Sequence, residues 1–244
     1  MTQSQPTPVP RAVLFDLFHT LVNVRPEPET GHTTWGLLGV SAEAWERALV
    51  ADAPGRAVGR VRCPVEGIGA LARAIDPTIP DDVVERAARW RERRFTHALR
   101  NPEPAVVDAV GRLRRSGRRI ALVSNAGFDE IGGWSASPLA EHFDAAVFSC
   151  DVGVAKPDAG IYEHALSRIG VEPREALFVG DGGSDEHRGA RRLGMRTAIV
   201  TRYLAETWPE RVEGRRAHAD EHHEDVPALA DHLLGGAAGP GPRP

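Results

Sequence analysis

The sequence predicts an α/β protein with a doubly wound parallel sheet and an all-helical segment inserted after the first strand. Three observations support this fold class. Short apolar runs recur along the chain, helical patterns separate the later runs, and the first two runs lie too far apart for a simple crossover. Strands that alternate with helices through right-handed crossovers form a parallel sheet covered by helices on both faces.

Five apolar runs are the predicted strands. Each run is continuous rather than alternating between apolar and polar residues, which is typical of strands buried on both faces. The five runs are Ala12–Phe15, Ile120–Val123, Ala145–Phe148, Ala176–Val179 and Thr197–Val200.

Helical patterns occupy the segments around the later strands. In the second of them, Ile161, Ala165 and Ile169 share one face, and Gly170 is a typical C-terminal stop. The four predicted core helices are Glu103–Ser116, Pro157–Gly170, Ser184–Leu193 and Pro227–Leu234.

The long stretch after the first strand, residues 23–101, is predicted to be the helical insert. Its three helical patterns are Ser41–Asp52, Pro64–Ile75 and Pro80–Leu99. Its tryptophans Trp35, Trp45 and Trp90 form either the core of this insert or part of a pocket beneath it. The sheet domain then comprises residues 11–22 and 102–234, and we expect disorder in the proline-rich lead 1–10 and the glycine-rich tail 235–244.

The composition narrows the classes of function. The 244 residues include 30 basic and 34 acidic side chains, a formal net charge of −4, which argues against nucleic acid as the main partner. No apolar run approaches the roughly 18 residues of a membrane span, and the N-terminus does not look like a secretory signal. Two distant cysteines exclude a disulfide framework and predict a cytoplasmic location. The oligomeric state cannot be predicted.

Polar residues follow four of the predicted strands. These residues are Asp16, Ser124, Lys156 and Asp181. Because ligands of an open parallel sheet bind beyond the carboxyl ends of its strands, we expect these side chains to converge. Of the 30 basic residues, Lys156 is the only lysine, which favours a specific role for its compact ammonium group.

This set of residues is suited to a dianionic group. Asp16 and Asp181 would repel each other unless a hard divalent cation such as Mg²⁺ lay between them. Lys156 adds positive charge and Ser124 supplies a hydroxyl donor, while a carboxylate is placed to attack the bound group. The sequence therefore predicts a Mg²⁺ site that binds a dianionic group and places a carboxylate to attack it.

The ordered motifs resemble those of the haloacid dehalogenase superfamily. The first is matched by Asp16 and Thr20, the second by Ser124, the third by Lys156, and the Gly-Asp acidic loop by Asp181 with Asp185 or Glu186. The resemblance covers nearly the whole chain between the lead and the tail. It implies a Rossmann-like core with a helical cap, an Asp16 nucleophile that forms a covalent aspartyl intermediate, and Mg²⁺ held by Asp16, the carbonyl of Phe18, Asp181 and one of the two acidic residues. It also implies that Thr20, Ser124, Asn125 and Lys156 surround the phosphate.

Phe18 departs from the family pattern. Phosphatases of the family carry an aspartate here as general acid and base, and acid–base catalysis is worth about 10²–10⁴-fold in rate. His19 is adjacent and is an alternative proton donor. True 2-haloacid dehalogenases carry an aromatic residue here but lack the aspartate matched by Asp181. Three readings stay open: a phosphohydrolase for acidic leaving groups, a dehalogenase-like carbon–halogen hydrolase, and a non-catalytic binding protein.

The histidines near the C-terminus are the weakest candidate for a site. His218, His222 and His223 lie among acidic residues, but their spacing fits no regular metal-binding element. We expect them to occupy a solvated loop before the last helix.

Overall fold

The computed structural model describes residues 9–24 and 32–235. Its centre is a six-stranded sheet with the strand order β3-β2-β1-β4-β5-β6, in which all neighbouring strands are parallel. The predicted doubly wound α/β fold is confirmed. The strands are β1 (Ala12–Phe15), β2 (Arg119–Ser124), β3 (Ala145–Phe148), β4 (Ala176–Gly180), β5 (Arg196–Val200) and β6 (Glu221–His223).

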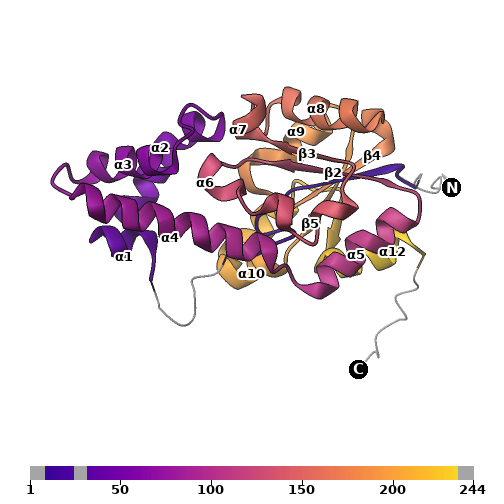
Figure 1. The fold of residues 1–244 in the computed structure, drawn as a ribbon. Helices are drawn as coiled ribbons and strands as arrows, with labels where there is room; N and C mark the ends of the chain where they lie inside the picture. Colours follow the sequence, from indigo (N-terminus) through magenta and orange to yellow (C-terminus); the bar gives the residue numbers. More distant parts are fainter. Residues whose placement is uncertain (1–8, 25–31, 236–244) are drawn as a thin grey trace.

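The sheet has a hydrophobic core on each face, because alternate residues of a strand point to opposite sides. Val13 and Phe15 belong to one core, and Ala12 and Leu14 belong to the other. Helices α5 and α12 cover the first face, and α8 and α9 cover the second (Figure 1). These helices are α5 (Pro104–Arg115), α8 (Ala159–Ile169), α9 (Glu186–Arg192) and α12 (Val226–Leu233).

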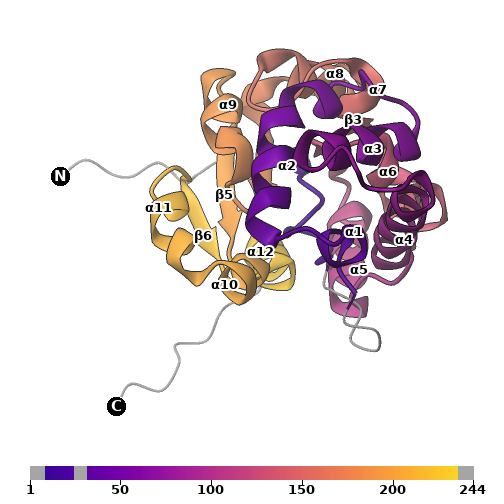
Figure 2. The same ribbon diagram turned by 90° about the vertical axis from the view of Figure 1, so that its left-hand side faces the viewer.

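Four helices of the insert lie beyond one end of the sheet (Figures 1 and 2). They have a core of their own, in which Trp45 packs with Ile68, Leu71 and Val84. The first helix, which the sequence did not predict, is short and begins after the N-cap Thr33. The four are α1 (Thr34–Leu38), α2 (Ala42–Ala57), α3 (Pro64–Ile75) and α4 (Asp81–Arg100).

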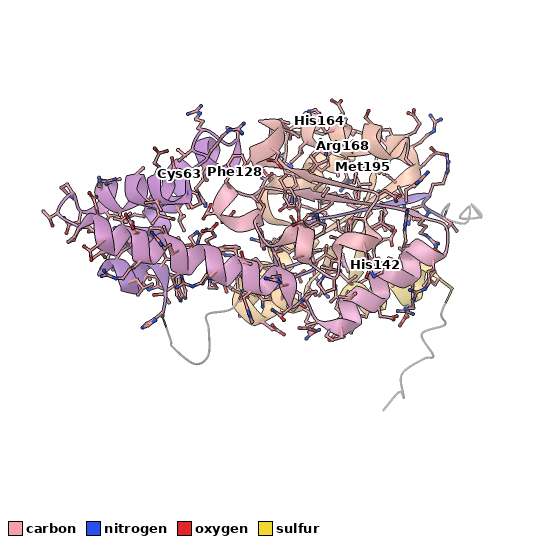
Figure 3. The ribbon with its side chains drawn as sticks, viewed as in Figure 1. Cys63, Phe128, His142, His164, Arg168 and Met195 are labelled. Atoms are coloured by element: carbon pink, nitrogen blue, oxygen red, sulfur yellow. The ribbon has the colours of Figure 1, made fainter. Side chains whose placement is uncertain are left out.

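Short helical turns connect the sheet to the insert and complete the C-terminal part. Figure 3 shows Phe128 of α6 at the junction with the insert, where the guanidinium of Arg62 lies 5.3 Å from its ring centroid. The remaining elements are α6 (Phe128–Ile131), α7 (Ser149–Val152), α10 (Arg202–Thr207), α11 (Val212–Arg216), η1 (Trp134–Ala136), η2 (Ala140–His142), η3 (Pro173–Glu175), η4 (Gly183–Asp185) and η5 (Pro209–Arg211).

The predicted loop around the C-terminal histidines is wrong in one respect. Glu221–His223 forms the edge strand β6, which pairs in parallel with Ala198–Val200 of β5. Asp220 fixes the start of this strand, because its carboxylate accepts hydrogen bonds from the backbone and hydroxyl of Thr197 at 2.9 and 2.8 Å. A polar segment can therefore pair at a sheet edge without the apolar run that marks the inner strands.

The predicted lead and tail fall almost entirely outside the described residues, and the exact boundaries proposed for sheet domain and insert stay a prediction. Within residues 9–24 and 32–235, no helix combines the length and the apolar character that crossing a membrane requires. The predicted cytoplasmic location also stays a prediction.

Candidate active site

Asp16 stands directly after β1, at the carboxyl end of the sheet. Its backbone N–H donates to the carbonyl of Val179 at 2.8 Å, which extends the pairing of β1 with β4 by one residue. Its carboxylate is buried and accepts a hydrogen bond from the Thr20 hydroxyl at 3.0 Å on Oδ2. The other oxygen, Oδ1, lies 2.5 Å from Nζ of Lys156. These contacts hold the carboxylate in one orientation.

Lys156 connects two buried carboxylates. Its ammonium contacts Asp16 and also lies 2.7 Å from Oε2 of Glu186. Burial lowers the pKa of Lys156, but the charges of Asp16 and Glu186 outweigh burial and raise it overall. The only lysine of the chain is therefore held as a charged group inside the site.

Asp16, Asp181 and Glu186 form a buried acidic cluster. One oxygen of each carboxylate lies within 4.8 Å of the others. Burial, together with the charges of Asp16 and Asp181, raises the pKa of Glu186 to about 8, against the opposing effect of Lys156. Three converging carboxylates are an oxygen-only donor set, so the cluster fits the ligand preference of Mg²⁺.

The structure separates the two acidic residues that the sequence left as alternatives. Glu186 is the first residue of α9 and faces inward, where Oε1 accepts a hydrogen bond from the backbone of Gly182 at 2.8 Å. Asp185 has a left-handed backbone with φ of 51°, and its exposed carboxylate pairs with Arg188 at 3.6 Å. The geometry therefore favours Glu186 as the acidic residue of the site.

Gly180 makes room for Glu186. A Cβ at this position would lie 2.1 Å from Oε1 of Glu186 and 2.6 Å from its carboxyl carbon. No side chain therefore fits at Gly180 without displacing the carboxylate from the cluster.

Ser124 is the last residue of β2 and Asn125 follows it, and the two side chains differ in their contacts. The Ser124 hydroxyl is buried and has no hydrogen-bond partner among the described residues, so it is available to a ligand. The Asn125 amide is already used: it donates to the carbonyl of Lys156 at 2.9 Å and accepts from the Lys156 backbone at 2.7 Å. Asn125 thus positions the Lys156 loop. Its predicted phosphate contact, and that of Thr20, would need these hydrogen bonds to be shared or exchanged.

Phe18 and His19 occupy the turn after Asp16. The Phe18 ring packs edge-on against Phe95 of α4, with centroids 5.2 Å apart. His19 has a left-handed backbone with φ of 63° and packs edge-on against Trp208 at 4.8 Å. Burial lowers the pKa of His19, although Asp181 and Asp16 oppose this effect, and Nδ1 has no partner in the described part of the chain.

Arg215 of α11 is a site residue that the sequence analysis missed. Its Nη1 forms an ion pair with Oδ2 of Asp181 and donates to the Asp181 carbonyl at 3.3 Å. Its side chain also packs over Gly182. Nothing in the sequence distinguishes Arg215 from the other 28 arginines, because only the folding of α11 onto the acidic loop brings it here.

A cavity of about 520 Å³ lies between the insert and the loops that carry these residues. Phe18, His19, Asn125 and Ser184 line its sheet side. Residues of α1, α2 and α4 line its insert side, including Trp35. Of the three tryptophans whose role the sequence left open, Trp35 lines the cavity, Trp45 is buried in the insert core, and Trp90 lies beneath the guanidinium of Arg94.

Comparison with known proteins gives curated relatives for part of the chain. The phosphoserine phosphatase of Thermus thermophilus is 36% identical over 128 residues, which are 52% of this chain and 51% of the relative. The glyceraldehyde 3-phosphate phosphatase of Methanothermobacter thermautotrophicus is 29% identical over 137 residues, 55% of this chain and 57% of the relative. The chain thus spans about half the length of these relatives.

Solved structures share the fold over more of the chain. The L-2-haloacid dehalogenase of Xanthobacter autotrophicus has a TM-score of 0.62 at 21% identity, with 93% of this chain and 99% of that chain covered. A haloacid dehalogenase-type phosphatase from Thermococcus onnurineus has a TM-score of 0.59 at 23% identity, with 92% and 98% covered. The family model of haloacid dehalogenase-like hydrolases matches residues 10–194. On that match, which agrees with the order of the motifs along the strands, the chain belongs to the haloacid dehalogenase-like hydrolases.

Proposed function

We propose that the protein is a Mg²⁺-dependent phosphohydrolase that acts on a small phosphorylated substrate through an aspartyl phosphate on Asp16. The observation that carries this proposal is the burial of Asp16 against Lys156 within a cluster of three carboxylates. A carboxylate that acted alone as a nucleophile would not need a buried lysine and two further carboxylates beside it. A dianionic phosphoryl group needs positive charge around it, which Lys156 supplies and a cation held by the carboxylates would increase. The names of the curated relatives, which are phosphatases, support the same chemistry.

The acidic cluster provides the residues that would hold the metal. Asp16, Asp181, Glu186 and the backbone carbonyl of Phe18 are the proposed ligands. When bound there, Mg²⁺ would offset the charge of the carboxylates and polarise a phosphoryl oxygen.

In the first half-reaction, a carboxylate oxygen of Asp16 attacks the phosphorus. A bond forms between this oxygen and phosphorus while the bond from phosphorus to the leaving-group oxygen breaks, and the electron pair stays with the leaving group. Lys156, 2.5 Å from Asp16, orients the carboxylate and neutralises negative charge as it develops. The unpartnered Ser124 hydroxyl donates to a phosphoryl oxygen.

In the second half-reaction, water attacks the phosphorus of the aspartyl phosphate. Inorganic phosphate leaves, the Asp16 carboxylate is restored, and one proton of the water must be accepted by a base. Phe18 cannot accept it. No carboxylate stands at position 18 to accept the proton, so the proton passes to solvent and we expect the aspartyl phosphate to hydrolyse slowly and to accumulate.

The replacement of the usual acid by Phe18 limits the substrates. Without a donor beside the leaving group, the leaving oxygen departs as an anion, so its own acidity determines the rate. Acyl and aryl phosphates meet this requirement and simple alkyl phosphates do not. We therefore propose activated phosphate esters or mixed anhydrides as substrates.

The proposal is tested with the full-length protein, 4-nitrophenyl phosphate and acetyl phosphate. We expect phosphate release that requires Mg²⁺, stops with a chelator, and is accompanied by a phosphorylated protein in the intact mass of acid-quenched samples. Asp16→Asn and Glu186→Gln should abolish turnover, whereas Asp185→Asn, a change in the exposed neighbour, should retain it.

A parallel panel of 2-haloacids separates the dehalogenase alternative. Halide release that persists in chelator, together with no phosphate release from either phosphorylated compound, would overturn the phosphohydrolase. Normal folding with no turnover on either panel would favour the non-catalytic reading.

A further inference from the structure

The walls of the cavity next to the site are largely apolar. The insert contributes Trp35, Leu49 and Phe95, and the sheet domain contributes Phe18 and Trp208. Trp35, Leu49, Phe18 and Trp208 are only half-buried, although comparable side chains elsewhere in the insert, such as Trp45, are buried. When an apolar ligand covers apolar surface in a concave site, both surfaces are removed from water, and this burial favours binding.

Most polar side chains in this cavity already have partners within the protein. Glu130 accepts hydrogen bonds from Arg91, from Arg56 at 3.3 Å and from the backbone of Gly127 at 2.8 Å. The Thr207 hydroxyl donates to the carbonyl of Tyr203 at 2.9 Å. Asn125 is held by the backbone of Lys156, as described above.

These partners decide what kind of leaving group the cavity can recognise. A polyol or amino acid would lose its hydration in the cavity and find few groups free to replace it, which carries a cost for each unpaired polar atom. An apolar leaving group has no such requirement. At about 520 Å³, the cavity lies within the roughly 300–1,000 Å³ range of sites that enclose drug-sized ligands.

We propose that the leaving group is a bulky apolar one, and an aromatic one by preference, so that the substrate class is the aryl phosphates and the acyl phosphates of aromatic acids. This inference rests on the proposed function for its chemistry. Two independent features lead to the same class. The apolar walls favour a leaving group with a large apolar surface. Because Phe18 stands in place of an acid, the site also favours a leaving group whose oxygen departs as a stable anion, as the oxygens of phenols and carboxylic acids do. The flat ring of such a group can also pack against Trp35, Trp208 and Phe95 in offset or edge-on geometry.

The first experiment compares 1-naphthyl phosphate with phenyl phosphate. Their leaving groups are phenols of similar acidity that differ in apolar area. A difference in rate between the two esters therefore reports contacts with the cavity and not the acidity of the leaving group. We expect kcat/KM to be about tenfold or more higher for the naphthyl ester, because pocket contacts of one or more methylene equivalents change it by roughly 10–200-fold. Leu49→Asn should remove most of this preference. Val50→Asn, one residue along α2 at a side chain that is 69% exposed, should leave it unchanged.

Binding is measured separately, so that the inference does not depend on turnover. Calorimetry with 1-naphthylmethylphosphonate and methylphosphonate, neither of which can be hydrolysed, should show at least about tenfold tighter binding of the aromatic compound. Trp35→Ala is a second variant for the case in which Leu49→Asn lowers the thermal stability of the insert, and it should reduce the same binding ratio.

The outcomes distinguish the two proposals. Preferential binding of the aromatic phosphonate without phosphate release from any ester would overturn the proposed function and leave the apolar site standing. Brisk turnover with equal kcat/KM for naphthyl and phenyl esters, or with a preference for small polar phosphates, would overturn the apolar leaving group and leave the phosphohydrolase standing.

Discussion

Single residues explain both why this site resembles its family and why it differs. Asp16 and Lys156 form the central ion pair, and Phe18, in the turn after Asp16, packs against Phe95 of α4.

Restoring a carboxylate at position 18 should change the dependence on the leaving group. In the unmodified protein we expect rates across aryl phosphates to fall steeply as the leaving-group pKa rises, provided that phosphoryl transfer to Asp16 limits the rate. Phe18→Asp should flatten this dependence and raise alkyl phosphate turnover by about 10²–10⁴-fold. The contact with Phe95 is lost in this variant, so Phe18→Ala is the matched control for packing alone. Brisk alkyl phosphate hydrolysis by the unmodified protein would show that another group, with His19 the first to test, donates the proton.

Lys156→Arg should be nearly as harmful as Lys156→Ala. The ammonium fits between two buried carboxylates, and a longer side chain with a planar fork cannot occupy the same space with the same contacts. Steady-state kinetics with 4-nitrophenyl phosphate should show a large loss of kcat in both variants. Arg93→Lys, at an exposed position on α4, controls for a general Arg/Lys effect. Wild-type kinetics in Lys156→Arg would contradict a specific role for the lysine.

Arg215 should compete with a metal ion for Asp181. Its guanidinium pairs with Oδ2 of Asp181, and a hydrogen bond to a charged group contributes about 1.5–3 kcal/mol. Arg215→Gln should therefore tighten Mg²⁺ binding by about tenfold or more, measured by calorimetry without substrate. Arg211→Gln, at a more exposed arginine paired with Glu210, should leave the Mg²⁺ affinity unchanged. Weaker binding in Arg215→Gln would mean that Arg215 orients Asp181 for the metal.

At the scale of elements, a buried ion-pair network joins the insert to the sheet domain. Arg91 of α4 donates to Asp129 at 2.6 Å and to Glu130 at 2.5 Å, and both acceptors belong to α6. Arg56 of α2 reaches the same two carboxylates at 3.8 and 3.3 Å. The positive charges of two arginines therefore neutralise the negative charges of two carboxylates at the junction.

Removing one residue of this network should lower the free energy of unfolding more than breaking an ion pair on the surface does. Arg91→Met leaves buried carboxylates with one cation fewer, and a broken buried pair costs about 3–5 kcal/mol of the free energy of unfolding. Arg89→Met, on the same helix, breaks an exposed pair with Glu85 and should cost at most about 1 kcal/mol. Urea denaturation of the two variants measures the difference, and equal losses would contradict the structural role of the network.

The edge strand β6 should contribute a pH-dependent part of the stability. The imidazole of His223, whose Nε2 lies 3.5 Å from Oε2 of Glu221, and the guanidinium of Arg196 lower the pKa of Glu221 to about 2, although partial burial opposes them. Between about 2 and the ordinary value of 4.5, the unfolded chain binds more protons at this group than the folded chain does. The stabilisation by Glu221 is therefore complete above pH 4.5 and is lost as the pH falls through about 2.

Glu221→Gln isolates this contribution. Above the ordinary carboxyl pKa, the free energy of unfolding should be larger for the wild-type protein than for the variant. This difference in the free energy of unfolding should narrow as the pH falls, which urea denaturation at a series of acidic pH values measures. Glu213→Gln, at an exposed residue of α11, should show no such convergence. A gap that is constant with pH would mean that Glu221 stabilises β6 without its charge.

At the scale of the whole molecule, the site lies where two independently packed parts meet. The sheet holds Asp16, Ser124 and the acidic loop on strand ends that its parallel pairing fixes in register. The insert has its own core and supplies one wall of the cavity. The cavity is therefore bounded by both parts of the chain, with Phe18 and Trp208 on the sheet side and Trp35 and Leu49 on the insert side.

The sequence by itself determined the features that depend on local patterns. Continuous apolar runs predicted five of the six strands, because a strand buried on both faces must be apolar throughout. The residues after those runs predicted the convergence of Asp16, Lys156 and Asp181, because parallel strands end at one edge of the sheet. The lysine stood out because it is alone among arginines.

Only the tertiary structure decided the features that depend on distant segments. The backbone turn directs the carboxylate of Glu186 into the acidic cluster and that of its neighbour Asp185 to solvent. Arg215 reaches Asp181 because α11 folds over the acidic loop, and β6 exists because β5 offers a free edge to a polar segment. The half-buried apolar walls of the cavity arise in the same way, because the packing of the insert against the sheet domain determines which of its apolar side chains are buried and which face the cavity.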